Sequence, residues 1–143
     1  MGIARLAHYS VRTLDLQASL RFYTELLQLQ VGFRPPFDFP GLWLYCSDDV
    51  ADFGVLHLIG VERGENEGLR RYLRERETDA GAGALDHIAF AATDWPAMRA
   101  RCNAAGVPYV ARTVPMLAQH QVFLEDPSGV TIELNYPAAE ADG

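Results

Sequence analysis

The chain repeats one short pattern of residues in its two halves. The segment at 6–33, LAHYSVRTLDLQASLRFYTELLQLQVGF, and the segment at 85–110, LDHIAFAATDWPAMRARCNAAGVPYV, both begin with a short apolar run that carries a histidine at its third residue. His8 therefore matches His87. A pattern that occurs twice indicates two copies of one supersecondary unit, and this constrains the fold more than any local feature does.

The residues that follow each histidine predict a helix. Asp15 and Asp94 both lie seven positions after their histidine, and aspartate is favoured at a helix N-cap. An amphipathic stretch follows each aspartate, and we expect it to end at Gly32 in the first half and at Gly106 in the second. Each half is thus predicted to begin with a strand and continue with a helix.

Strand signals follow each predicted helix. The first half contains GLWLYCS at 41–47 and FGVLHLIGV at 53–61, and the second contains HQVFLED at 120–126 and VTIELNY at 130–136. The last two are joined by a DPSG turn at 126–129. We therefore predict an α+β fold of two tandem βαβββ modules.

The length of 143 residues suits one domain. We expect a single domain over 1–143 with a charged connector between the modules. The connector is expected to contain a short helix around Leu69, Tyr72 and Leu73, with its arginines on a solvated face. The parts are module one at 3–61, the connector at 62–83, module two at 84–137 and a tail at 138–143.

Charge and hydropathy exclude some classes of function. The formal net charge is −7, so the chain lacks the basic surface that a nucleic acid backbone requires. No run of 18 apolar residues and no targeting segment is present, so we expect a cytoplasmic protein without a membrane partner. Cys46 and Cys102 lack a metal-binding or disulfide spacing and are expected to be reduced.

Two further polar residues match each other in the repeat. His57 lies 49 residues after His8, and Glu133 lies 46 residues after His87, so both fall in the last strand of their module. Strand alternation places Glu133 with Thr131 and Asn135 on one face. Taken singly, each histidine also suits a hydrogen-bonded core imidazole, and Glu133 suits a solvent-facing carboxylate.

Together these positions suggest a metal site. Imidazole nitrogens with one carboxylate suit a borderline divalent ion such as Fe, Mn, Ni, Co or Zn. His8, His87 and Glu133 would form a set of two histidines and one carboxylate. His57 would be a fourth ligand or a base beside the metal.

The paired βαβββ plan, the histidine in the first strand of each half and the ending EDPSGVTIELNY resemble the vicinal oxygen chelate superfamily over roughly residues 5–137. This superfamily includes glyoxalase I, bleomycin-binding proteins and extradiol dioxygenases. The resemblance implies a curled, mostly antiparallel sheet with a concave metal site. It also implies a small-molecule substrate that chelates the metal through neighbouring oxygens, a homodimer, and the ligand set His8, His57, His87 and Glu133.

The resemblance leaves three activities open. Glyoxalase-like lyase or isomerase chemistry is the leading hypothesis, with Glu133 as the proton-transfer base, although glyoxalase I usually has a glutamate where His57 stands. An iron(II) extradiol dioxygenase is the second, and His120 would then be its pocket histidine. A drug- or metabolite-binding protein without turnover, like the bleomycin-resistance proteins, is the third.

Several other side chains are candidates for the pocket. Phe37, Phe39, Trp43 and Tyr45 would line it or pack in the core, and both interpretations fit an apolar segment. The same holds for Phe53 and Phe123, which flank the predicted ligand strands. Arg12 shares the His8 face of its strand by alternation and would hold a substrate carboxylate or form a surface ion pair.

Overall fold

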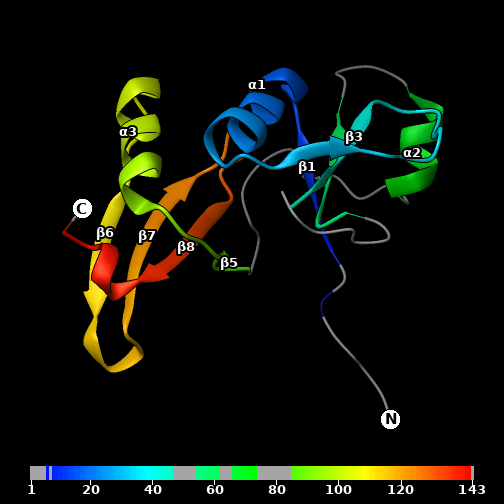
Figure 1. Cartoon of the computed structure of the whole chain (residues 1–143). Helices are drawn as coiled ribbons and strands as arrows, with labels where there is room; N and C mark the ends of the chain where they lie inside the picture. The colour runs from blue at the N-terminus through cyan, green and yellow to red at the C-terminus, as the bar shows by residue number, and fades with distance from the viewer. Residues whose placement is uncertain (1–5, 7, 47–53, 62–65, 74–84, 143) are drawn as a thin grey trace, which may run out of the picture. The chain divides into compact units, whose positions relative to one another are not determined.

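The structure of the chain is a computed structural model, and it describes residues 6, 8–46, 54–61, 66–73 and 85–142 (Figure 1). The chain divides into two compact units, Met1–Ala80 and Gly81–Gly143. The division falls within the predicted connector.

The first unit is a four-stranded mixed sheet in the order β1-β4-β3-β2. The first and last strands of the unit pair in parallel, and the other pairs are antiparallel. Helix α1 continues into a π-helical turn before β2. The elements are β1 (Tyr9–Thr13), α1 (Leu16–Arg21), the turn Phe22–Leu26, β2 (Gln30–Gly32), β3 (Gly41–Tyr45), β4 (Leu56–Gly60) and α2 (Glu67–Leu73).

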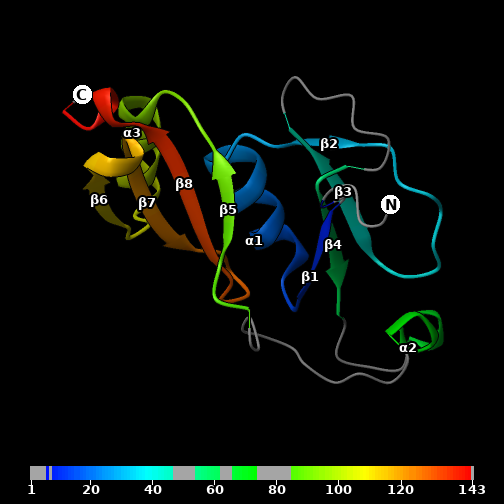
Figure 2. The same cartoon turned by 90° about the horizontal axis from the view of Figure 1, so that it is seen from below.

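The second unit repeats this plan with the sheet order β5-β8-β7-β6, as Figure 2 shows. Again the first and last strands pair in parallel, and the others are antiparallel. The predicted α+β fold with two βαβββ modules is therefore confirmed. The elements are β5 (Ile88–Ala91), α3 (Trp95–Ala105), β6 (Val110–Val114), a 3₁₀ turn (Pro115–Leu117), β7 (Gln119–Glu125), β8 (Thr131–Pro137) and a second 3₁₀ turn (Ala138–Glu140).

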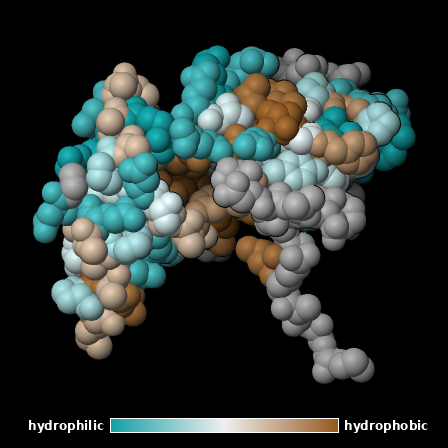
Figure 3. All heavy atoms as spheres, viewed as in Figure 1, coloured by the Kyte–Doolittle hydropathy of each residue, from teal (hydrophilic) through white to brown (hydrophobic). Residues whose placement is uncertain are grey.

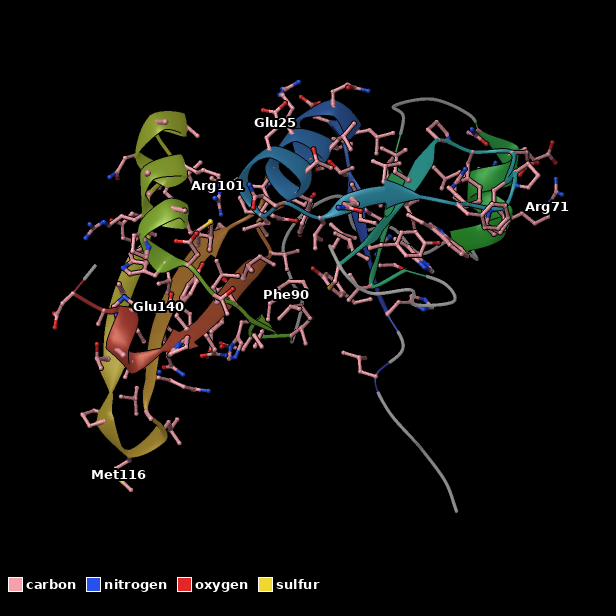
Figure 4. All side chains as sticks on the ribbon, in the orientation of Figure 1. Glu25, Arg71, Phe90, Arg101, Met116 and Glu140 are labelled. Atoms are coloured by element: carbon pink, nitrogen blue, oxygen red, sulfur yellow. The ribbon has the colours of Figure 1, made fainter. Side chains whose placement is uncertain are left out.

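Both predicted helix starts are confirmed. The Asp15 carboxylate accepts a hydrogen bond from the Ala18 backbone N–H at 2.9 Å, and Asp94 accepts one from the Ala97 N–H at 3.3 Å. At α3 the Glu140 carboxylate adds a second acceptor, 2.7 Å from the Trp95 backbone nitrogen. Glu140 is labelled beside this end of α3 in Figure 4. The acceptors satisfy N–H groups that have no partner inside the helix.

The prediction that two matched glycines end the helices is correct only for the second unit. Gly106 caps α3 in the left-handed conformation, with φ 66°. In the first unit Gln28, with φ 61°, takes the left-handed conformation soon after the π-helical turn, and Gly32 lies at the end of β2 instead. There the Tyr45 ring covers Gly32 so closely that a Cβ would collide with it. Gly32 therefore serves side-chain packing between strands.

The predicted turn between the last two strands is also present. The Asp126 carboxylate accepts hydrogen bonds from the backbone N–H groups of Ser128, at 2.9 Å, and Val130, at 2.8 Å. Gly129 takes a φ of 82°, which glycine adopts without steric cost. The turn fixes the register of β7 against β8, and with it the position of Glu133 opposite Phe123.

Each unit packs its helix against one face of its own sheet. In the connector, Leu69 of α2 packs on Phe39 and Ile59, as the predicted helix requires. No helix among the described residues is long and apolar enough to cross a membrane. The largest fully buried apolar side chains are Tyr23, Leu44, Leu56 and Leu58 in the first unit, and Met98, Cys102, Val122 and Ile132 in the second.

Apolar side chains remain uncovered at one end of the second unit. Figure 3 shows apolar atoms at the tip of the β6–β7 hairpin, and Figure 4 labels Met116 there. Met116 is 97% exposed, and its neighbour Leu117 is 59% exposed. No residue of the second unit that the structure describes covers this tip.

The core of the second unit holds two groups that ionise at high pH. Burial raises the pKa of the Cys102 thiol and the pKa of the Tyr136 phenol. Cys102 is therefore a protonated core thiol near neutral pH, and neither cysteine forms a disulfide. This agrees with the expected reduced state.

We expect Tyr136→Phe to remove part of the loss of stability at alkaline pH. The folded-state pKa of Tyr136 is raised, so its contribution is complete below the unfolded pKa of about 10 and is lost as pH rises above it. The free energy of unfolding, measured in urea between about pH 8 and pH 11, should fall less steeply in the variant. Tyr109→Phe, at a less buried tyrosine, is the control and should keep the wild-type slope.

Candidate functional site

The structure places the four predicted ligand positions at matched points of the two sheets. In the first unit Ser10 of β1 pairs with His57, and in the second unit Ala89 of β5 pairs with Glu133. His8 and His87 lie two residues before Ser10 and Ala89. Because side chains alternate along a strand, each histidine shares a sheet face with the polar residue of its parallel partner strand. The sequence spacing of 49 and 46 residues therefore reflects one shared register.

In the second unit, His87 and Glu133 are in direct contact. The His87 Nε2 atom lies 2.8 Å from the Glu133 Oε2 atom. The other ring nitrogen, Nδ1, lies 2.7 Å from the Asp86 carboxylate, which is almost fully exposed. Glu133 itself is 7% exposed, so its carboxylate needs partners to offset the cost of burial. His87 supplies one of them.

Gln121 supplies the second partner of Glu133. The Gln121 Nε2 group donates to the Glu133 Oε1 atom at 2.9 Å and to the Asn135 Oδ1 atom at 3.2 Å. The Gln121 Oε1 atom accepts from the Arg112 Nε group at 2.9 Å. Four side chains from β6, β7 and β8 thus form one hydrogen-bonded chain across the sheet, which we call the polar chain: Arg112, Gln121, Glu133 and Asn135.

Gln121 and Arg112 are functional candidates that the sequence did not predict. Alternation in β7 carried the necessary signal for Gln121, because Gln121 and Phe123 share a face and Phe123 pairs with Glu133. Arg112 required the register of β6, and no turn signal in the sequence fixes that register. Phe123 also contacts the site, since its ring lies edge-on to His87 with the ring centroids 6.2 Å apart.

In the first unit, three rings form a stack. The His57 imidazole lies parallel to the Trp43 indole, with centroids 3.9 Å apart and 2° between the planes. On its other side it stacks with His8 at 3.9 Å and 20°. His57 is 5% exposed, whereas His8 is exposed. The stack covers His57 and explains how an imidazole is buried beside Trp43 on the adjacent strand β3.

Aromatic side chains extend this stack along the first sheet. The ring centroid of Phe37 lies 6.3 Å from that of Trp43, and the Phe37 ring stacks with the Phe39 ring at a centroid distance of 5.3 Å. The Arg34 guanidinium lies about 5 Å from both phenylalanine rings. Phe37 is 40% exposed, while Phe39 is buried against Ile59 and Leu69. We call Phe37, Trp43, His57 and His8 the aromatic surface.

The remaining candidates from the sequence have different surroundings. Arg12 is on the His8 face, as alternation predicts, and Tyr45 donates a hydrogen bond to the Phe33 carbonyl at 2.7 Å. Phe53, expected beside the ligand strands, lies outside the described residues. A cavity of about 510 Å³ lies at the opposite end of β1 from His8, lined by residues 13–17, Pro40, Gly60 and Val61.

His120 lies on the opposite face of its sheet from Glu133. It pairs with Tyr136 across β8 and with Thr113 across β6, and its Nδ1 atom lies 3.0 Å from the Thr113 hydroxyl. Its ring packs 5.4 Å from that of Trp95 in α3. Alternation along β7 turns His120, the residue next to Gln121, toward the helix.

The residues of the second unit suit part of a metal site. The His87 nitrogen and the Glu133 oxygen approach the same point, and Asp86 would hold the His87 ring through Nδ1, as carboxylates do for metal-bound histidines. In the first unit the nearly parallel rings of His8 and His57 do not direct two nitrogens to one point. Among the residues that the structure describes, no three His, Cys, Asp or Glu side chains gather as a metal site.

Comparison with known families identifies the class of protein. The model of the Glyoxalase/Bleomycin resistance protein/Dioxygenase superfamily matches residues 5–134. The chain belongs to this superfamily. The resemblance noted in the sequence is therefore confirmed.

Solved structures share the fold at low sequence identity. Lactoylglutathione lyase from Agrobacterium tumefaciens is 18% identical, with 95% of this chain and 96% of that chain covered and a TM-score of 0.60. A glyoxylase/bleomycin resistance protein/dioxygenase domain from Frankia sp. EAN1pec is 17% identical, with 95% and 93% covered and a TM-score of 0.69. TnmS3, an antibiotic binding protein from Streptomyces sp. CB03234, is 19% identical, with 96% and 98% covered and a TM-score of 0.62. No curated protein matches the chain significantly.

We expect Gln121→Leu to destabilise the second unit. The variant leaves the buried Glu133 Oε1 atom without its donor, which costs about 1–3 kcal/mol of unfolding free energy. Urea denaturation measures the change. Gln30→Leu, on an exposed position of β2, is the matched control and should change the free energy by less than about 0.5 kcal/mol. If the two variants lowered the free energy of unfolding equally, the hydrogen bond from Gln121 would not be what stabilises the buried Glu133.

Proposed function

We propose that the chain is a divalent-metal-dependent enzyme with lyase or isomerase chemistry of the glyoxalase type. Its substrate is a small molecule that chelates the metal through neighbouring oxygens. The observation that carries this proposal is the convergence of His87 Nε2 and Glu133 Oε2, 2.8 Å apart. In position, His87 matches His8 of the other unit and Glu133 matches His57. The duplicated plan therefore supports one common function for these four polar side chains.

The residues of the second unit have distinct roles in this proposal. His87 and Glu133 are metal ligands, and Glu133 also accepts the proton that moves during the reaction. Asp86 holds the His87 ring, and Gln121 holds the Glu133 carboxylate through Oε1, which leaves Oε2 for the ligand and proton roles. The bound metal would supply Lewis-acid stabilisation of negative charge on substrate oxygen.

His8 and His57 are proposed as further ligands, with His57 alternatively a base. Their stacked rings would have to turn for both nitrogens to bind an ion. A homodimer and a cytoplasmic location, expected from the sequence, stay predictions.

Metal content tests the proposal. Protein purified anaerobically without added metal is expected to hold about one equivalent of a divalent ion, measured by elemental analysis. His87→Ala and Glu133→Gln should each lower retention by about 10-fold or more, because each removes a donor from the ion. His8→Ala and His57→Gln should do the same if these residues are ligands. His120→Gln, on the other face of the sheet, is the control and should retain the metal.

The identity of the metal separates the enzymatic activities. Nickel, cobalt, zinc or manganese that is lost in His87→Ala supports the lyase or isomerase proposal. Iron with consumption of O₂ in the presence of catechols would replace it with ring-cleaving dioxygenation. A protein that binds none of these ions even after reconstitution would overturn metal dependence altogether.

The aromatic surface favours a second candidate function, which is binding of a planar small molecule without turnover. Phe37 and Trp43 present rings beside His57 and His8, and flat π-systems bind flat ligands by stacking. TnmS3, which shares the fold, is described as an antibiotic binding protein.

Calorimetric titration with naphthalene-2,3-diol tests this second candidate. Metal-free protein is expected to bind this planar diol and not cyclohexane-1,2-diol, which has the same oxygens without an aromatic ring. Trp43→Ala should weaken binding by about 3- to 10-fold, since it removes one stacking partner. Phe33→Ala, at an exposed ring that makes no described ring contact, is the control. Equal affinity for both diols would exclude recognition by stacking.

A further inference from the structure

We propose that Arg112 is the binding site for a carboxylate group of the ligand. This inference deepens the proposed function, since it assigns the substrate class of the site that contains His87 and Glu133. It rests on that function for the identity of the site, although its geometry belongs to the second unit alone.

Two contacts fix the Arg112 side chain although it is exposed. Its Nε group donates to the Gln121 Oε1 atom at 2.9 Å. Its guanidinium lies over the Phe123 ring, 5.2 Å from the ring centroid. A long side chain on an edge strand normally loses considerable rotamer entropy when it binds a ligand. Here part of that entropy is already lost, so binding costs less.

The contacts of Arg112 leave part of its guanidinium group available to a ligand. Nε is engaged by Gln121, but the two terminal nitrogens have no hydrogen-bond or ion-pair partner among the described residues. A guanidinium presents its N–H groups in a plane that matches the two oxygens of a carboxylate. The pair of terminal nitrogens is therefore available for a ligand group of this shape.

The position of Arg112 relates this group to the proposed reaction site. Phe123, beneath the guanidinium, is the cross-strand partner of Glu133, and its ring also contacts His87. The Gln121 amide separates Arg112 from Glu133, bonding to both, and no ion pair joins the arginine to the glutamate in the part of the chain that is described. Glu133 thus does not neutralise the charge of the guanidinium. This charge is available to a ligand whose other end reaches His87 and Glu133.

The surrounding charges favour one negative charge on the ligand. Glu133 is a carboxylate on the same face of the sheet as Arg112, the cation of the polar chain, and the Asp86 carboxylate contacts His87. A phosphate dianion would carry one charge more than a single guanidinium balances. The ligand is therefore a monocarboxylate that also has neighbouring oxygens for the metal.

Calorimetry with a matched pair of probes tests the inference. The probes are 3,4-dihydroxybenzoate and 3,4-dihydroxybenzamide, which have the same shape and differ in charge. Wild-type protein, metal-loaded and metal-free, is expected to bind the benzoate about 10-fold or more tightly than the amide, as a charge-assisted hydrogen bond provides. Arg112→Gln should abolish this preference and leave the affinity for the amide within about twofold.

A second arginine provides the control. Arg99→Gln removes the same charge from an exposed position on α3, across the sheet, and should keep the preference. Arg112→Lys keeps the charge without the planar fork and should keep only part of the preference. A preference that survives Arg112→Gln, or that is absent in the wild type, would overturn the assignment. Stronger competition by inorganic phosphate than by benzoate would overturn the choice of a carboxylate.

The metal-free arm separates this inference from the proposed function. If the protein retains no metal but its Arg112-dependent preference persists, the carboxylate site stands and metal dependence falls. If metal is retained and lost in His87→Ala while the wild type shows no preference, the proposed function stands and the Arg112 site falls.

Discussion

The parallel pairing of the first and last strands in each unit determines where the four predicted ligand residues lie. This pairing joins residues about 45 positions apart in the chain, and it places the histidine before the first strand next to a polar residue of the last strand. A shift of one residue would turn Glu133 or His57 toward the helix and an apolar neighbour toward the site. The buried faces of β4 and β8, with Leu56, Leu58 and Ile132, hold the register against such a shift.

Much of this arrangement was predictable because duplication and alternation are written locally in the sequence. The Asp15 and Asp94 caps and the Asp126 turn each depend on residues within a few positions of one another. The matched histidines depend on a short pattern that occurs in both halves of the chain. The surroundings of Gly32 and His120 could not be predicted in the same way. The role of Gly32 depends on the Tyr45 ring from another strand, and the orientation of His120 depends on whether a strand begins at one residue or the next. Neither is visible in local composition.

The polar chain shows what sequence reasoning omits when it selects residues by type. Histidine and glutamate are selected as candidates because they ionise and bind metals, whereas Gln121 carries no charge and does not ionise. Yet Gln121 is 6% exposed and contacts three polar side chains of the chain at once. Its amide is both donor and acceptor, so it is the residue type that can join a cation to a carboxylate without neutralising either. The arginine and the glutamate are therefore joined through an uncharged residue that stands between them.

The two tryptophans are distributed one to each unit. Trp43 lies flat against His57 in the first, and Trp95 is buried among Tyr109, His120 and Tyr136 in the second. Each indole therefore has a different environment that exists only when its own sheet is formed. Single-tryptophan versions of the chain would emit light that reports on one half at a time, so the order in which the duplicated halves fold is open to direct optical observation.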